Sequence, residues 1–93
     1  MKITLRIRVV VDHIVITVTN DDTIFIVSDR PASWSLTNAA VDVYDAFKMF
    51  LSLNPKLNVV FDVDHQQLHA IVHERAAQAF VAGITDAVRR AGA

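Results

Sequence analysis

Apolar and polar residues alternate strictly over residues 2–11, which predicts a β-strand with one buried face and one solvated face. The apolar positions of this segment are Ile3, Leu5, Ile7, Val9 and Val11. A second alternating segment begins at Ile14, after Asp12 and His13. A two-residue loop at Asp12-His13 would pair Val11 with Ile14 and keep both apolar sets on one face. Residues 23–28 are almost continuously apolar and predict a third strand after a polar turn at residues 20–22.

The apolar period lengthens to three or four residues after residue 33, which predicts a helix capped by Ser35 or Thr37 and ended by Asn54-Pro55. Trp34, just before it, is expected to pack at the edge of the core. Residues 57–63 predict a fourth strand. Asp64 then has the context of a helix N-cap, with a glutamine in the capping-box position three residues later. The second helix is expected to run unbroken to about Arg90.

The order of these elements, βββαβα, predicts a single α+β domain over residues 1–93, built as a two-layer α/β sandwich. A right-handed strand–helix–strand crossover joins parallel strands, so the fourth strand is expected beside the first. The four-stranded mixed sheet then has the order 3-2-1-4. Polar side chains that include Arg6, Arg8 and Asp62 share one face of this sheet, and both helices should cover the other face. On the polar face, Asp62 is expected to pair with Arg6 or Arg8.

This succession of meander, helix, strand and helix resembles the first part of the ribonuclease H-like fold. The resemblance implies metal-binding carboxylates in the middle of the first strand, on the first helix and at the end of the fourth strand. Asp64 matches the last position, and Asp42 or Asp45 loosely matches the second. The middle of the first strand, residues 7–9, holds no acidic residue. Two-metal nuclease chemistry therefore lacks a principal ligand, and topology alone does not carry that activity across.

Three histidines follow Asp64 at intervals of four residues: His65, His69 and His73. On one continuous helix they would lie along one side, and neutral imidazole is the commonest metal ligand among side chains. The spacing therefore predicts, as one alternative, a divalent metal site built from an i, i+4 pair and a carboxylate, either Asp64 or Asp12. His65 and His73 would be about 12 Å apart, too far to share one ion. The competing interpretation is that these residues serve as caps, packing and surface groups.

The ends of the strands offer a second candidate cluster. Asp12 and His13 follow the first strand, and Asp64 and His65 follow the fourth. Because neighbouring parallel strands end at the same edge of a sheet, these four side chains could converge there. Each also has a local structural role, in a turn or in the first turn of a helix.

Composition removes several classes of function. The chain is 53% hydrophobic and 20% charged, with a net charge of −1, two glycines and no cysteine. No global positive field attracts nucleic acid, and the strand with Arg6 and Arg8 has no aromatic residues for base stacking. Thiolate metal centres, disulfides and glycine-rich phosphate loops are excluded. No apolar run has the length of a membrane span and no leader is recognisable, so neither a nucleic-acid nor a membrane partner is predicted, and the cytoplasm is the default location.

No catalytic constellation and no cofactor site is readable, so the predicted function is that of a stable, non-catalytic domain, not an enzyme. Short connections and agreement between local and global patterns are typical of idealised or designed (de novo) proteins. A single glutamate, Glu74, and three lysines are unlike a design driven by helix propensity. Two alternatives remain open: a metal-binding domain that uses the helix histidines, and a small protein-interaction module that self-associates as a homodimer because of its apolar excess.

Overall fold

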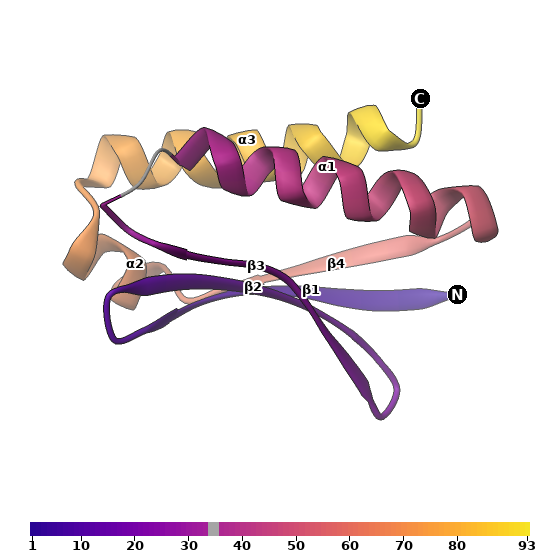
Figure 1. The fold of residues 1–93 in the computed structure, drawn as a ribbon, viewed down its shortest axis with the longest axis horizontal. Coiled ribbons are helices and arrows are strands. Elements are labelled where there is room, and N and C mark those ends of the chain that lie inside the picture. Colours follow the sequence, from indigo (N-terminus) through magenta and orange to yellow (C-terminus); the bar gives the residue numbers. More distant parts are fainter. Residues whose placement is uncertain (34–35) are drawn as a thin grey trace.

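The computed structural model describes residues 1–33 and 36–93, which form a layer of sheet beneath a layer of helices (Figure 1). Strands β1 (Lys2–Val10), β2 (His13–Asn20), β3 (Thr23–Pro31) and β4 (Asn58–Val63) follow the spatial order β3-β2-β1-β4. The pairs β1–β2 and β2–β3 are antiparallel, and β1–β4 is parallel. The predicted two-layer sandwich and its order 3-2-1-4 are confirmed.

Helices α1 (Leu36–Leu53) and α3 (Glu74–Ala91) lie side by side over one face of the sheet (Figure 1). They cover the alternating apolar positions of β1 and β2, as the period-two pattern predicts. The most fully buried large side chains are Leu5, Ile7, Ile16, Val43, Phe47, Leu68 and Ile84. α1 ends directly before Asn54-Pro55, as predicted, and Thr37 lies inside the helix. Trp34 and Ser35 lie outside the described residues.

The loop between β1 and β2 lies one position earlier than predicted, and the pairing register of the two strands therefore shifts by two residues. It consists of Val11 and Asp12, so that Val10 pairs with His13 and Val9 with Ile14. A shift of two residues leaves every side chain on its predicted face, because side chains alternate with a period of two. The shift has a local cost. The positive φ falls on Val11, at 58°, and this β-branched side chain is 88% exposed.

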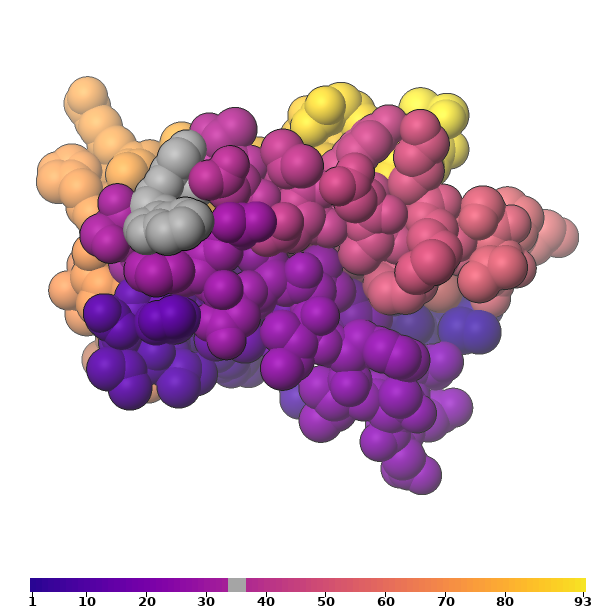
Figure 2. Space-filling view, in the orientation of Figure 1, coloured from indigo at the N-terminus to yellow at the C-terminus, as the bar shows by residue number. Residues whose placement is uncertain are grey.

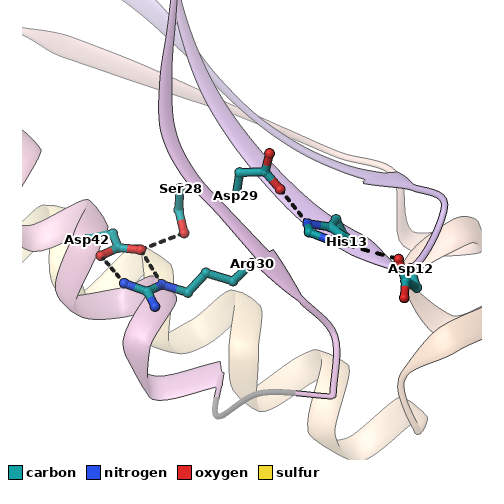
Figure 3. A network of polar contacts seen from close by, with 6 residues as sticks. All are labelled: Asp12, His13, Ser28, Asp29, Arg30 and Asp42. Carbon is teal, nitrogen blue, oxygen red and sulfur yellow. Dashed lines mark hydrogen bonds and ion pairs between the residues drawn. The ribbon is translucent and has the colours of Figure 1, made fainter.

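Strand β3 is longer than its apolar run. The sequence predicts an end at Ser28, but pairing with β2 continues to Pro31. A register irregularity opposite Ile16 and Thr17 inserts Val27 as an extra residue. The bulge lets the polar residues Asp29 and Arg30 continue the strand while they point to opposite faces of the sheet (Figure 3).

The predicted single second helix is wrong, because the structure divides it into α2 (His65–Ile71) and α3. Val72 is extended between them, with φ −130° and ψ 132°. One helix from His65 to Ala91 would be about 40 Å long, whereas the longest dimension of the molecule is 35 Å. The break lets α2 bury Leu68 completely against β1, and α3 then returns across the sheet. The predicted cap is confirmed: Asp64 Oδ1 accepts a hydrogen bond from the Gln67 N–H at 3.1 Å.

Candidate functional site

The three histidines do not share one helix. His65 and His69 lie on α2, with ring centroids 6.1 Å apart, and both side chains are exposed. His73 lies beyond the break and caps α3, where its Nδ1 accepts a hydrogen bond from the Arg75 N–H at 3.3 Å. The expectation that the three histidines lie along one side of one helix is therefore wrong.

The candidate metal site is therefore reduced to one pair of imidazoles. Asp64, the expected carboxylate partner, uses its side chain to cap α2. Across residues 1–33 and 36–93, the structure brings together no group of three or more histidine, aspartate or glutamate side chains that could hold a metal ion. Two imidazoles on one exposed helix face would have to recruit further ligands from solvent or from another molecule.

The four residues expected to converge at the strand ends do not form one cluster, because Asp12 and His13 lie apart from Asp64 and His65. His13 Nδ1 lies 2.7 Å from Asp29 Oδ1, and Asp12 Oδ1 lies 3.8 Å from His13 Nε2 (Figure 3). Asp64 instead donates its backbone N–H to the Ile7 carbonyl at the end of β1. The sequence prediction missed Asp29 as the partner of His13, because the bulge that carries β3 past Ser28 has no local signature.

A second polar cluster joins β3 to α1 (Figure 3). Arg30 donates from Nε and Nη2 to the two oxygens of Asp42, at 2.7 and 2.9 Å. Ser28, which is buried, donates its hydroxyl to Asp42 Oδ2 at 2.8 Å. The bidentate hydrogen bonds from Arg30 hold the pKa of the Asp42 carboxyl below its usual value, although partial burial opposes this shift. All three side chains are engaged with one another, so the cluster holds the helix on the sheet.

The open face of the sheet, opposite the helices, carries the arginines that the sequence singled out. Arg8 Nη2 lies 2.8 Å from Asp62 Oδ2, and Arg6 Nε lies 3.3 Å from the same oxygen. The predicted pairing across β1 and β4 is confirmed for both arginines. Hydrogen bonding from Arg8 lowers the pKa of Asp62, so this carboxylate stays ionised and offsets much of the positive charge of the face.

Strand β3 lies at one edge of the sheet and carries three consecutive large apolar side chains that remain exposed. Ile24, Phe25 and Ile26 are 63%, 48% and 68% exposed. We call these three residues the apolar edge. Ile24 and Ile26 point to the open face, and Phe25 points to the helical face, where its ring lies 6.2 Å from that of Phe50. The predicted order 3-2-1-4 already places this strand at an edge of the sheet, but the apolar run alone does not reveal how much of its side chains the helices leave exposed.

Next to the apolar edge, the end of the sandwich is hollowed. A depression of about 270 Å³ lies between the start of β1, the β2–β3 hairpin and the end of α1. Its lining residues are Met1, Ile3, Val18, Asn20, Phe25, Phe50, Leu53, Asn54 and Leu57. Apolar surface thus continues from the edge of the sheet toward the open end of the core.

Comparison with protein-family models, with curated proteins and with solved structures finds no match for this chain. None of the described helices is both long enough and apolar enough to cross a membrane.

Proposed function

We propose that this protein is a small, non-catalytic interaction module that self-associates through the apolar edge of β3. The observation that carries the proposal is the exposure of three consecutive large apolar side chains on a strand with a free edge. Such an edge presents unpaired backbone donors and acceptors together with apolar side chains, which is the usual template for strand addition.

Apolar residues exposed elsewhere support this choice by contrast: on the other edge strand, β4, Val60 and Phe61 are only 38% and 37% exposed. Val41, Met49 and Leu53 are also exposed, but they lie on α1, where the backbone is satisfied within the helix. Only an edge strand adds directional hydrogen bonds to apolar burial. Within Thr23–Val27, β3 also lacks a charged or proline residue of the kind that commonly protects edges.

We take a second copy as the occupant because the apolar edge can pair with itself, and the charge of the chain does not oppose this pairing. At a net charge of −1, two copies repel each other weakly. The arginines of the open face are paired with Asp62, and the described polar clusters hold elements of the chain together. The Ser28 hydroxyl, which donates to Asp42, is buried, and the Asp42 carboxylate is held by Arg30, which supports a binding role over a catalytic one.

Two features argue against an idealised, designed origin. A designed hairpin would place glycine, asparagine or aspartate where Val11 adopts a positive φ. A designed edge strand would carry a lysine or another charge in place of Ile24 or Ile26. Both differences from an idealised design fit better with a chain in which the exposed strand β3 binds a partner strand.

Sedimentation velocity over a wide concentration range tests the proposal. The wild-type protein should shift from monomer to dimer as concentration rises, and Ile26→Lys should remain monomeric. Val41→Lys introduces the same charge at a 51% exposed site on α1 and should associate like the wild type. A wild-type protein that stays monomeric throughout, or a Val41→Lys variant that dissociates as readily as Ile26→Lys, would contradict the proposal.

A further inference from the structure

We infer that β3 pairs antiparallel with β3 of a second copy, in a register centred on Phe25. The inference rests on the proposed self-association and specifies its geometry. The twofold axis passes between the two Phe25 residues, Ile24 of each copy lies opposite Ile26 of the other, and the two sheets become one. The interface is isologous, as expected for a closed dimer.

The backbone of the apolar edge is oriented for this pairing. Asn20 and Thr23 close the two-residue loop between β2 and β3, and a turn of this length bonds the Thr23 N–H to the Asn20 carbonyl. Thr23 therefore directs its backbone groups toward β2. Because these directions alternate along an antiparallel strand, Phe25 also faces β2, whereas Ile24 and Ile26 direct N–H and C=O toward the free edge.

The outward groups match only certain registers. With Phe25 at the centre, the Ile24–Ile26 pairs become hydrogen-bonded pairs, and each pair exchanges two backbone hydrogen bonds between the copies. The two Phe25 residues then form the intervening non-hydrogen-bonded pair. A shift of one residue would place outward groups opposite inward ones and would turn apolar side chains to the wrong face.

The faces of the strand select the same register. Pairing about an axis normal to the sheet keeps each face on its own side, so Ile24 and Ile26 meet on the open face and the two Phe25 rings meet on the helical face. A centre at Ile26 would place Ile24 opposite Ser28, which lies beyond the bulge and points to the other face. A centre at Ile24 would place the acidic residue Asp22 opposite Ile26. The register centred on Phe25 pairs the whole apolar edge with itself.

The shape of the molecule leaves this segment accessible. The β2–β3 turn and the start of β3 bend away from the helical layer (Figure 1), and the same segment protrudes from the body of the molecule in Figure 2. Asp21 and Asp22 at the turn and Asp29 beyond the bulge bound the apolar edge at its two ends. Pairing is therefore confined to a short segment, and we expect a reversible dimer of modest affinity.

Single-cysteine variants test the register, and the absence of natural cysteine keeps the reaction specific. In the inferred dimer, the two Cα atoms of residue 25 lie about 4.5 Å apart, within the range that a disulfide spans. Residues 27 of the two copies would be roughly 13 Å apart. Under mild oxidation, Phe25→Cys should therefore form at least about tenfold more disulfide dimer than Val27→Cys.

A second measurement retains Phe25. A mixture of Ile24→Cys and Ile26→Cys chains should yield the mixed disulfide in preference to either homodimer, since residue 24 of one copy faces residue 26 of the other and neither faces its own counterpart. If Val27→Cys is cross-linked as fast as Phe25→Cys, or the mixed disulfide is not favoured, the register is wrong even where the wild type sediments as a dimer. A monomeric wild type overturns the proposed function and the inference together.

Discussion

Replacing Val11 with glycine should raise the free energy of unfolding, because Val11 is held in a conformation that β-branched residues avoid. Its φ is 58°, and it is the first residue of the two-residue loop between β1 and β2. The side chain is 88% exposed, so almost no apolar burial is lost when it is removed. The substitution therefore isolates the backbone contribution from packing.

The expected magnitude follows from two opposing effects. The left-handed conformation costs an L-residue roughly 1–2 kcal/mol, and a β-branched side chain belongs at the upper end. Glycine loses additional conformational entropy on folding, about 0.5–1 kcal/mol. The net stabilisation is about 1–1.5 kcal/mol, which corresponds to a rise in Tm of about 4–12 °C for a domain of this size.

Thermal and urea unfolding followed by circular dichroism measure this difference. Val10→Gly is the matched control, since Val10 is the adjacent residue, is 54% exposed and lies within β1. That variant should be less stable than the wild type by about 0.5–1 kcal/mol. If Val11→Gly is neutral or destabilising while Val10→Gly behaves as expected, the loop is not at Val11-Asp12 and the register that pairs Val10 with His13 is wrong.

Three further outcomes are expected. Asp42→Asn should destabilise the protein at neutral pH. Because the pKa of Asp42 is lowered in the folded state, the difference in free energy of unfolding is present above the pKa of the unfolded chain and should shrink as pH falls below about 4. Urea unfolding at several pH values measures this difference. A difference independent of pH would contradict a stabilising role for the Arg30–Asp42 pair. Asp62→Ala should barely change Tm at physiological salt, because its pairs with Arg6 and Arg8 are exposed; a large loss would show that this cluster stabilises the sheet. Calorimetric titration with Zn²⁺ should detect only weak binding, and micromolar binding lost in His69→Ala would show that a further ligand completes the His65–His69 pair.

The elements that the sequence predicts well are those with a local cause. Strict alternation in β1 and β2 follows from one buried and one solvated face, and both strands have this pattern. Asp64 is followed by a glutamine three residues later and forms the predicted cap. The order of the strands follows from the handedness of the crossover and the length of the connections. None of these inferences requires knowledge of distant contacts.

The features that the sequence does not reveal depend on the assembled fold. Residues 65–91 have no proline, and nothing local marks Val72 as a break. The break arises because Leu68 and α3 must both reach a core shorter than a single helix of that length. The bulge at Val27 similarly lets Arg30 reach Asp42 on α1, a partner that sequence analysis did not consider.

Among the candidate sites, too, some contacts were predictable from the sequence and others depend on the assembled fold. The pairing of Asp62 with the arginines was predictable, because strand order places their positions on one face. The metal site depended on helix continuity, and it was reduced to one pair when the helix divided. The apolar edge was visible as a run of apolar residues on a strand predicted at the edge of the sheet, but its exposure depends on how the assembled layers cover that strand.

Hydrogen exchange at individual backbone amides is the most direct test of self-association through the apolar edge. The amide of Phe25 should be protected at every concentration, because it faces β2 within one copy. The amides of Ile24 and Ile26 should exchange rapidly at about 10 µM and become protected at about 1 mM, as mass action fills the dimer. Amides at residues 24 and 26 that exchange equally fast at both concentrations would contradict the account.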